Sequence, residues 1–482
     1  MKSIPKEKVI SCLAAENSWW ESPYEIPSTF SVLQPRPYLE LLFPLVNMTT
    51  PRRAVVLMGP RRVGKTVLVH HAIQRLLNIG VSPQRICYTS VDHPLYHGLG
   101  LEEILTSYME ITGIDYTKEE CYLFFDEIQY LRDWELHLKA VVDRYHHCHC
   151  LASGSAAAAL RLKSNESGAG RFTDFMLPPL TFQEYLALLG RSELVTIERS
   201  SDGLTENVST EDIEQLNRNF LGYLNYGGYP EVALSKDIQQ DPSRFIKNDI
   251  IDKVLLRDLP SLYGIQDVQE LNHLFTTLAF NTGTEVSLES LAQSSGVAKN
   301  TIKRYIEYLE AAFLIRVVHR VDMSARRFKR ANFFKVYLTN PSIHTALFSP
   351  VDDNDDIIGN LVETAIFSQS FHSNEHLYYA RWNKGKVDMV HLGPDQKAIW
   401  AVEVKWSDRY FERPNELSAL LRFCHAQNLT DGWVTSKTKH GIKPIESVSL
   451  RFLPASLYCY YLGHNIIQNR YALAGLGEDT RG

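Results

Sequence analysis

An α/β fold built on a parallel sheet is the architecture to expect from the first part of this 482-residue chain. Short apolar runs at residues 54–58, 86–91 and 121–125 alternate with segments in which apolar residues recur at helical spacing. Strands that are apolar along their whole length are typical of parallel sheets, because helices cover both faces. The first run is followed directly by a glycine-containing segment that opens a helical pattern. The chain therefore contains a strand, loop and helix in immediate succession.

Residues 59–66 read Gly-Pro-Arg-Arg-Val-Gly-Lys-Thr and match the G-x-x-x-x-G-K-T phosphate-binding loop in its required setting. The two glycines let backbone N–H groups approach phosphate oxygens. Lys65 is expected to reach the β- and γ-phosphates, and Thr66 to supply a hydroxyl for Mg²⁺. The helix that follows presents its positive end to the anion. The expected cofactors are ATP and Mg²⁺, with nucleotide contacts from Gly59, Pro60, Arg61, Arg62, Val63, Gly64, Lys65, Thr66 and Val67.

The third apolar run ends in Asp126 and Glu127. Ligands of parallel α/β sheets bind at the carboxyl ends of the strands, so these two side chains belong to the nucleotide site. Asp126 is expected to hold Mg²⁺ directly or in its second shell, and Glu127 to polarise the attacking water. An acidic pair of this kind indicates ATP hydrolysis rather than phosphorylation of a small molecule.

A fourth apolar run, residues 148–152, leads into Ser153-Gly154-Ser155, where Ser155 or Ser153 is the candidate sensor of the γ-phosphate. Further on, a glycine-containing turn ends in Arg171. Arg171 is a candidate for stabilising charge on the γ-phosphate, in cis or across a subunit interface, and a surface arginine is the alternative. Arg61 and Arg62 are alternative cationic contacts to nucleotide or partner.

Seven segments together carry a family resemblance: residues 59–66, 123–129, 134–135, 153–155, 170–171, 177–185 and 226–231. They resemble prokaryotic AAA-type ATPases, of the STAND and archaeal-ATPase-like kind, that carry a C-terminal domain of unknown function. The resemblance extends from about residue 35 to about residue 465. It implies an ASCE/AAA-type P-loop NTPase domain and leaves the task of the protein open.

A helix-turn-helix pattern begins near Ser287, and the β-type run at residues 314–318 that follows predicts a winged helix. Between Lys299 and Lys335 there are ten Lys and Arg against three Asp and Glu. Such a local excess of positive charge favours contact with duplex DNA, since phosphate contacts supply most non-specific affinity. A winged helix serves equally as a protein-docking module.

The last part of the chain carries a second set of charged residues. Glu363 lies in a helical pattern, Asp388 in a strand pattern, and Glu403 and Lys405 on one face of another strand. Carboxylates that hold Mg²⁺ and a lysine that orients water or offsets charge are what metal-dependent phosphodiester hydrolysis requires.

These residues resemble the PD-(D/E)xK nuclease superfamily, with Val387 where the superfamily name has proline. The resemblance implies an α/β restriction-endonuclease-like domain in which Glu363, Asp388 and Glu403 hold metal and Asp388, Glu403 and Lys405 are catalytic. The alternative is a retained fold in which the same residues form a structural salt bridge.

The expected domain scheme runs as follows: a helical lead-in at 1–50, a P-loop ATPase core at 51–185, a helical lid with a variable insertion at 186–265, a winged-helix connector at 266–345, a nuclease-like domain at 350–465, and a tail at 466–482. Movement of the lid is expected to report hydrolysis to the rest of the chain.

Composition restricts the protein class. The net charge is −6, from 50 Lys and Arg against 56 Asp and Glu, so a nucleic-acid partner has to meet a local patch. Seven scattered cysteines without C-x-x-C spacing fit reduced thiols in the cytoplasm. The start of the chain lacks a signal-peptide core, and no apolar stretch is long enough for a bilayer, so no membrane partner is expected.

The function predicted from these features is ATP hydrolysis coupled to a domain that binds and cleaves DNA. One alternative is a nucleotide-dependent switch that binds a protein partner and carries an inactive nuclease fold. Another is a DNA-binding regulator without catalysis. A homo-oligomer is a further expectation, and the residues do not decide between it and a protein partner of another kind.

Overall fold

The computed structural model describes residues 5–21, 25–154, 170–199, 206–326, 332–373 and 376–473, with side chains as far as Arg470. The chain divides into two compact units. The first comprises residues 1–178 and 470–482, and the second residues 179–469. Two larger sheets are described, one of five strands and one of nine, and each belongs to one unit.

The first unit is built on a five-stranded sheet in the order β2-β3-β4-β1-β5, in which every pairing is parallel. The strands are β1 (Ala54–Met58), β2 (Ile86–Ser90), β3 (Cys121–Asp126), β4 (Cys148–Gly154) and β5 (Phe172–Met176). The four apolar runs predicted as strands are therefore confirmed. β4 continues two residues beyond its expected end and takes in Ser153.

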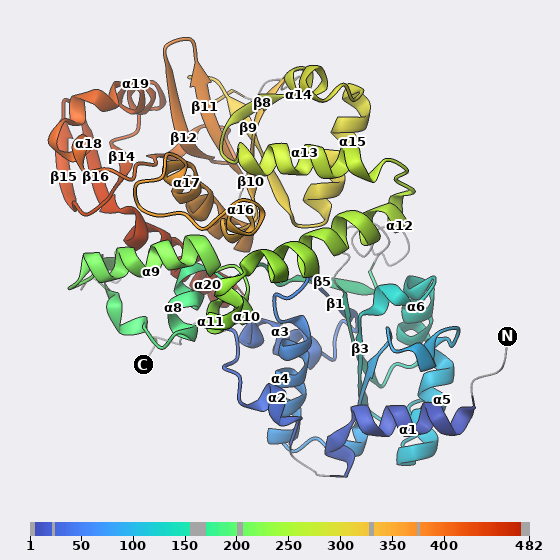
Figure 1. Ribbon diagram of the computed structural model, residues 1–482. Helices are drawn as coiled ribbons and strands as arrows, with labels where there is room; N and C mark the ends of the chain where they lie inside the picture. The colour runs from blue at the N-terminus through green and yellow to red at the C-terminus, as the bar shows by residue number, and fades with distance from the viewer. Residues whose placement is uncertain are drawn as a thin grey trace. The chain divides into compact units, whose positions relative to one another are not determined.

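Helices cover both faces of this sheet, as its apolar strands require. In Figure 1, α2, α3 and α4 lie on one side of the sheet, and α1, α5 and α6 lie on the other. Their bounds are α1 (Lys6–Glu16), α2 (Ser28–Ser31), α3 (Tyr38–Val46), α4 (Lys65–Asn78), α5 (Leu101–Thr112) and α6 (Trp134–Arg144). Short 3₁₀ turns join them: η1 (Ser18–Trp20), η2 (Pro83–Arg85), η3 (Pro94–Tyr96) and η4 (Ile128–Tyr130).

The outermost strand β2 is held by side chains of the N-terminal segment. Asn17 is fully buried; its Nδ2 donates to the carbonyls of Leu13 (2.7 Å) and Tyr88 (2.8 Å), and its Oδ1 accepts from the Tyr88 N–H (2.7 Å). Trp19 and Trp20 both donate from Nε1 to the carbonyl of Ile86. The exposed edge of the sheet is thereby closed to pairing with another strand.

The second unit contains a nine-stranded mixed sheet in the order β15-β16-β14-β13-β12-β11-β9-β10-β8. The strands are β8 (Glu285–Ser287), β9 (Ile315–Val321), β10 (Phe333–Leu338), β11 (Leu377–Trp382), β12 (Gly385–Leu392), β13 (Ala398–Glu403), β14 (Asp431–Ser436), β15 (Gly441–Ile445) and β16 (Val448–Pro454). A separate hairpin joins β6 (Thr196–Arg199) to β7 (Glu206–Ser209).

The helices of the second unit lie before, between and after these strands. They are α8 (Phe182–Leu188), η5 (Ser192–Leu194), α9 (Ile213–Tyr226), α10 (Pro230–Leu234), α11 (Lys236–Gln240), η6 (Ser243–Asp252), η7 (Val254–Asp258), α12 (Leu259–Tyr263), α13 (Val268–Phe280), α14 (Leu288–Ser295), α15 (Lys299–Ala311), α16 (Ser342–Leu347), α17 (Ile358–Gln369), η8 (Ser370–His372), α18 (Arg409–Glu412), η9 (Pro414–Leu417), α19 (Ser418–Gln427) and α20 (Ala455–Leu473). The segments η6 and η7 are π-helical.

The helix-turn-helix pattern corresponds to α14 and α15, and the antiparallel set β8, β10 and β9 accompanies it. The other edge of β9 pairs in parallel with β11, with Tyr378 opposite His319. The expected connector and the expected C-terminal domain therefore share one continuous sheet. The hydrophobic pattern indicates that β9 is buried but does not say which strand pairs with its second edge.

The segment expected as a lid also differs from the expected scheme. Phe182 of α8 and Phe220 and Tyr223 of α9 belong to the same buried cluster as residues of α17 and α20. Gln369 of α17 accepts the backbone N–H of Phe182 (3.1 Å). These helices thus form part of the core of the second unit. Their amphipathic patterns predict a buried face without specifying what covers it.

None of the seven cysteines forms a disulfide. In the part of the chain that the structure describes, no helix has both the length and the apolar character needed to cross a bilayer.

Replacing Asn17 with alanine leaves the N–H and C=O of Tyr88 without their side-chain partners. We expect Asn17→Ala to lower the free energy of unfolding by about 2 kcal/mol, the usual cost of unsatisfied buried polar groups. Urea unfolding followed by tryptophan fluorescence measures the change. The exposed Asn78 provides the matched control, since Asn78→Ala is expected to change stability by less than about 0.5 kcal/mol. Equal effects of the two substitutions would contradict the edge-closing role of Asn17.

Candidate functional site

The loop after β1 requires its two glycines for different reasons. A Cβ on Gly59 would lie 2.2 Å from the carbonyl oxygen of Leu177, which follows β5. Gly64 caps α4 with φ +94°, a left-handed conformation that side chains disfavour. The loop therefore packs tightly against the end of β5 and delivers the chain into α4 with its N–H groups exposed at the helix start.

Lys65 lies over this loop. Its Nζ donates to the carbonyl oxygens of Gly59 (3.0 Å) and Pro60 (2.8 Å), and the residue is buried. The ammonium group is thus held beside the backbone that is expected to bind phosphate. This placement fits the contact with the β- and γ-phosphates expected from the sequence.

Asp126 is the centre of the polar contacts at the carboxyl edge of the sheet. Its Oδ2 accepts from Thr66 Oγ1 (2.7 Å) and from the hydroxyl of Tyr88 (3.0 Å). Its Oδ1 accepts from Ser153 Oγ and from the backbone N–H of Glu127 (3.1 Å). Hydroxyl and carboxylate oxygens are the ligands that Mg²⁺ prefers, so Thr66 and Asp126 fit that ion.

Glu127 follows in a left-handed conformation with φ 52°, and its Oε2 accepts from Gln129 Nε2. Ser155 lies outside the described residues. Ser153, the alternative sensor, is the serine that contacts Asp126. Tyr88 was missed because the sequence gives β2 as a buried strand, and only the strand order brings its hydroxyl to Asp126.

Arg171 is not brought to the loop in this chain. The Ala54 N–H donates to the Arg171 carbonyl (2.8 Å), which places Arg171 at the amino edge of the sheet, whereas the loop begins at the carboxyl edge. A five-residue strand spans about 17 Å. The guanidinium Nε instead donates to Asp143 Oδ1 (3.0 Å). A role in cis thus does not fit this placement, and a role across a subunit interface stays a prediction.

Arg36 is a buried residue that sequence reasoning missed. Its Nη1 donates both to the carbonyl of Val63 in the loop (3.0 Å) and to the carbonyl of Pro178 (2.9 Å). Pro178 is the residue at which the first unit ends and the chain enters the second. One guanidinium therefore ties the phosphate-binding loop to the end of the first unit.

The second set of predicted residues comes together in the second unit. Asp388 on β12 is 1% exposed, and its Oδ2 lies 3.5 Å from Lys405 Nζ. Lys405 Nζ also lies 2.7 Å from Glu403 Oε1, although β13 ends at Glu403 and Lys405 lies two residues beyond the strand. The second carboxylate oxygen of Glu403, Oε2, is buried and has no hydrogen-bond partner.

Glu363 on α17 joins this cluster through a residue that was not predicted. Lys335 Nζ on β10 lies 2.6 Å from Glu363 Oε1 and 3.6 Å from Asp388 Oδ1. The Tyr337 hydroxyl also donates to Glu363 Oε1. Lys335 was counted among the basic residues of a DNA-binding face, because the sequence does not show that its strand adjoins the carboxylates.

The charged groups in this cluster shift one another's pKa values. Burial opposes ionisation of Asp388, but the ammonium groups of Lys335 and Lys405 outweigh it and hold its pKa below the usual range. Burial and the neighbouring Asp388 raise the pKa of Glu403 to about 7. Burial also raises the pKa of Glu363. The cluster therefore carries ionised Asp388 beside carboxyls that resist ionisation.

The fit of the cluster to Mg²⁺ depends on how many of its carboxylates converge. In the described ranges, no three His, Cys, Asp or Glu side chains converge as a metal-binding group. Mg²⁺ is commonly held by one or two carboxylates together with waters. Asp388 and Glu403 supply two carboxylates, but the predicted set of three ligands is not assembled: Glu363 is paired with Lys335 instead.

Comparison with known proteins separates the two units. Residues 51–186 match the family model described as an AAA domain, and residues 217–354 match a domain of unknown function, DUF8612. The first unit carries an AAA-type domain. Its match includes the phosphate-binding loop, Asp126 and Glu127, and it supports ATP binding and an ATPase activity.

Individual relatives are distant. An uncharacterized protein of Methanocaldococcus jannaschii is 26% identical over 364 residues, which are 72% of this chain and 74% of that protein. An uncharacterized protein of Haemophilus influenzae is 22% identical over 282 residues, which are 58% of this chain and 65% of that protein. A solved complex of S. cerevisiae Hsp104 with ADP is 18% identical, with a TM-score of 0.30 over 60% of this chain and 41% of that chain.

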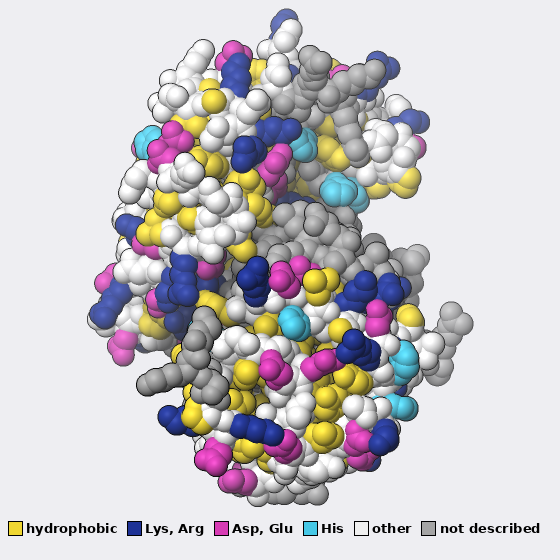
Figure 2. All heavy atoms as spheres, turned by 90° about the vertical axis from the view of Figure 1, so that its right-hand side faces the viewer, with side chains coloured by type: hydrophobic (Ala, Val, Ile, Leu, Met, Phe, Trp, Pro, Cys, Tyr) yellow, Lys and Arg dark blue, Asp and Glu magenta, His cyan; other side chains and the backbone are white. Residues whose placement is uncertain are grey.

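The predicted basic face is divided in the structure. Lys299 pairs with Glu289 (2.8 Å), Lys303 lies 3.9 Å from Glu307, and Lys335 is buried. Arg327, Lys329 and Arg330 lie outside the described residues. On the face that Figure 2 shows, Lys and Arg side chains lie beside Asp and Glu side chains. The local charge excess of the sequence is therefore spread over several environments.

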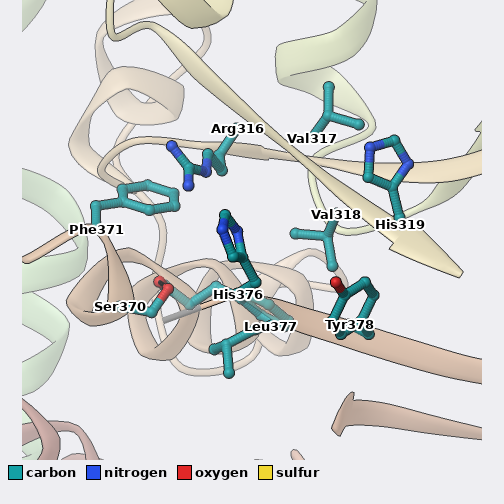
Figure 3. Close-up of a pocket in the computed structure, with 10 residues that line it drawn as sticks. Arg316, Val317, Val318, His319, Ser370, Phe371, His376, Leu377 and Tyr378 are labelled. Carbon is teal, nitrogen blue, oxygen red and sulfur yellow. Dashed lines mark hydrogen bonds between the residues drawn. The ribbon is translucent and has the colours of Figure 1, made fainter. Parts of the chain in front are cut away.

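A small cavity of about 70 Å³ lies between β9 and the segment before β11. Figure 3 shows Arg316 and His376 beside the ring of Phe371 in this cavity, and the guanidinium carbon of Arg316 lies 5.9 Å from the ring centre. The cavity is lined in part by basic groups, but none of the predicted site residues lines it.

Glu16, at the end of α1, is a titrating group within the AAA-type unit. Its Oε2 accepts from the hydroxyl of Tyr96 (2.8 Å). Burial raises the pKa of Glu16 to about 7, and the Tyr96 hydrogen bond offsets this only in part. The folded unit therefore binds a proton that the unfolded chain releases near the usual carboxyl pKa.

This proton makes stability depend on pH. Between pH 4.5 and about 7 the folded state holds more protons than the unfolded state, so the contribution of Glu16 to stability falls as pH rises through this window. We expect the free energy of unfolding of Glu16→Gln, relative to that of the wild type, to be higher at pH 8 than at pH 5. Urea unfolding at the two pH values measures this difference. Glu21→Gln is the control and is expected to leave the difference unchanged. A Glu16→Gln difference that is the same at both pH values would contradict the assignment.

Proposed function

We propose that the protein is a Mg²⁺-dependent ATPase whose nucleotide state controls a second unit that binds DNA and hydrolyses phosphodiester bonds. The observation that carries the ATPase part is the hydrogen bond of Thr66 with Asp126, directly beside the phosphate-binding loop of the AAA-type domain. The phosphodiester part rests on the convergence of Asp388 on β12, Glu403 at the end of β13 and Lys405 just beyond it.

In the first unit each polar group has a distinct task. Backbone N–H groups at the start of α4 bind the phosphates, and Lys65 turns from the loop carbonyls to the β- and γ-oxygens. Thr66 and Asp126 hold Mg²⁺, which offsets the charge of the phosphates when bound. Glu127 orients the attacking water, and Ser153 holds the Asp126 carboxylate in place.

In the second unit, Asp388 and Glu403 hold Mg²⁺, which when bound supplies Lewis-acid stabilisation of a phosphodiester. Lys405 lies between the two carboxylates and is placed to orient water or to neutralise charge on the reacting phosphate. Burying charged groups is costly unless they are paired, so their concentration in a sheet core supports a site. The helix pair α14 and α15 and the strands beside it are the proposed winged helix that contacts duplex DNA.

Arg36 supports the coupling of the two activities. Its guanidinium holds both Val63 of the loop and Pro178, so a shift of the loop on hydrolysis changes the position of the residue that leads into the second unit. Loops that follow the γ-phosphate are a common origin of such switching. Binding or loss of the γ-phosphate thereby changes the conformation of the chain where it enters the second unit.

A nucleotide-dependent switch with an inactive nuclease fold is the second candidate. The observation that favours it is the pairing of lysine with each carboxylate of the cluster: Lys335 pairs with Glu363, Lys405 pairs with Glu403, and both lie beside Asp388. In that case a protein partner, rather than DNA, binds with an affinity that depends on the bound nucleotide. The charged cluster then only stabilises the fold.

Two substitutions separate these functions. Lys65→Ala is expected to reduce ATP turnover at least about 100-fold, because the phosphates lose a charged contact. Asp388→Asn is expected to leave ATP turnover within about twofold while abolishing Mg²⁺-dependent DNA cleavage, assayed on single-stranded, duplex and branched substrates with and without ATP.

The exposed residues Lys118 and Asp356 provide matched controls, and Lys118→Ala and Asp356→Asn are expected to retain both activities. Absence of cleavage by the wild type on every substrate, with normal ATP turnover, would overturn the nuclease proposal and favour the switch.

A further inference from the structure

One face of the nine-stranded sheet carries both the charged cluster and an exposed aromatic ring. Residues directly opposite each other on neighbouring strands lie on the same face of a sheet. Lys335 on β10 is opposite Val318 on β9, and the same antiparallel register places Phe333 opposite Arg320. Arg320 in turn is opposite Tyr379 on β11. Phe333, Arg320 and Tyr379 therefore share the face of the sheet that carries Lys335.

Phe333 is exposed and has a guanidinium beside it. The residue is 45% exposed, and the guanidinium carbon of Arg320 lies 6.0 Å from the centre of its ring. Arg320 Nε also donates to the backbone carbonyl of Arg381 on β11 (3.1 Å), which fixes the position of this arginine. A single exposed apolar residue is ordinary on a protein surface. A ring held beside a guanidinium, however, offers an apolar face and a positive charge to the same ligand.

A series of contacts connects this ring to the charged cluster. The centre of the Tyr379 ring lies 5.5 Å from Lys335 Nζ, and the Tyr379 hydroxyl donates to Glu285 Oε2 (2.7 Å). Glu285 Oε1 lies 3.1 Å from Arg381 Nη1. Lys335 Nζ itself lies 3.6 Å from Asp388 Oδ1. The exposed basic residues and the buried cluster are thereby held at fixed positions on one face.

Two ion pairs on this face present positive charge to solvent. Arg381 pairs with Glu285 at 3.1 Å, and Lys386 pairs with Asp388 at 3.4 Å. The two basic side chains are 49% and 57% exposed, whereas the two acidic side chains are 11% and 1% exposed. A ligand that approaches from solvent therefore meets the guanidinium and ammonium groups first. Such a surface attracts a phosphate backbone.

An exposed ring together with positive charges is the combination that single-stranded nucleic acids bind. Sites of this kind combine a positive surface along the backbone with aromatic side chains on which bases stack. In a duplex, each base is covered on both sides by its neighbours, so stacking on Phe333 would first require unstacking. The exposed ring therefore favours a single strand over a duplex.

We propose that Phe333, Arg320 and Arg381 bind single-stranded DNA, with one base stacked on the Phe333 ring and phosphates in contact with Arg381 and Lys386. This inference rests on the proposed DNA-binding role of the second unit and names the form of DNA that reaches the charged cluster. The strand beside Lys386 is within reach of the cluster, because Lys386 Nζ lies 3.4 Å from Asp388 Oδ1. The duplex contact proposed for α14 and α15 is compatible with this site, since branched DNA offers both forms.

Equilibrium binding to the full-length chain tests this inference separately from cleavage. Fluorescence anisotropy follows a labelled oligothymidylate of about 16 nucleotides, and a duplex of the same length, in EDTA and without nucleotide. Phe333→Ala is expected to weaken single-strand binding at least about fivefold, because a base loses its stacking partner, and to change duplex binding by less than about twofold. Ile442→Ala truncates an apolar residue on β15 that is 56% exposed, and this matched control is expected to leave both affinities unchanged.

Two further variants separate stacking and charge from a general disturbance of the fold. Phe333→Trp keeps an aromatic face, so it is expected to bind the single strand at least as tightly as the wild type. Its added tryptophan fluorescence is expected to be quenched when the strand binds. Arg381→Gln is expected to weaken single-strand binding and to reduce the slope of log K against log salt by about 0.7, the value for one lost phosphate contact.

Single-strand affinity that Phe333→Ala leaves within about twofold, or an equal loss for single strand and duplex, would overturn the inference. A wild type that binds neither form would also overturn it, and the exposed ring would then favour the protein partner of the second candidate function.

The outcomes also distinguish this inference from the proposed function. If Phe333→Ala has no selective effect, but the wild type cleaves DNA and Asp388→Asn does not, the proposed function stands and only this inference fails. If Phe333→Ala selectively weakens single-strand binding and the wild type cleaves no substrate, the binding site stands and the phosphodiester part of the proposed function fails.

Discussion

The close packing of the phosphate-binding loop against the end of β5 is the constraint on which the first unit depends. Gly59 leaves no room for a Cβ beside the Leu177 carbonyl, and the Leu177 N–H donates to Met58 at the end of β1. The next residue, Pro178, shares the guanidinium of Arg36 with the loop. Anything that moves the loop therefore acts on the backbone that enters the second unit.

The nucleotide site could be predicted from the sequence because its residues lie in short contiguous motifs. Lys65 and Thr66 follow Gly64 directly, and Asp126 ends an apolar strand, so local pattern and parallel-sheet geometry together place them at one edge. Tyr88 and Arg36 depend on strand order and on contacts between distant segments. No periodicity in the sequence specifies those, and Arg171 was assigned to the site without knowledge of which end of its strand it occupies.

The second unit shows the same limit more strongly. Asp388, Glu403 and Lys405 were predicted to lie together, and they do, because β12 pairs with β13 and Lys405 follows the end of β13. Lys335 enters their cluster only because β9 pairs with β11 and so joins two predicted domains in one sheet. A residue counted as part of a DNA-binding surface is in fact the buried partner of Glu363 and Asp388. The chemistry of the cluster is consequently set by charges from four separate stretches of the chain.

The most direct test of the account is whether nucleotide and DNA affect each other's binding. By linkage, a nucleotide that changes the affinity for DNA by some factor must have its own affinity changed by the same factor when DNA is bound. The account predicts that a non-hydrolysable ATP analogue and ADP give DNA affinities that differ at least about fivefold, with a matching change in analogue affinity. It also predicts that Arg36→Ala binds both ligands but reduces the factor to about one. Identical DNA affinity of the wild type with either nucleotide would contradict the account.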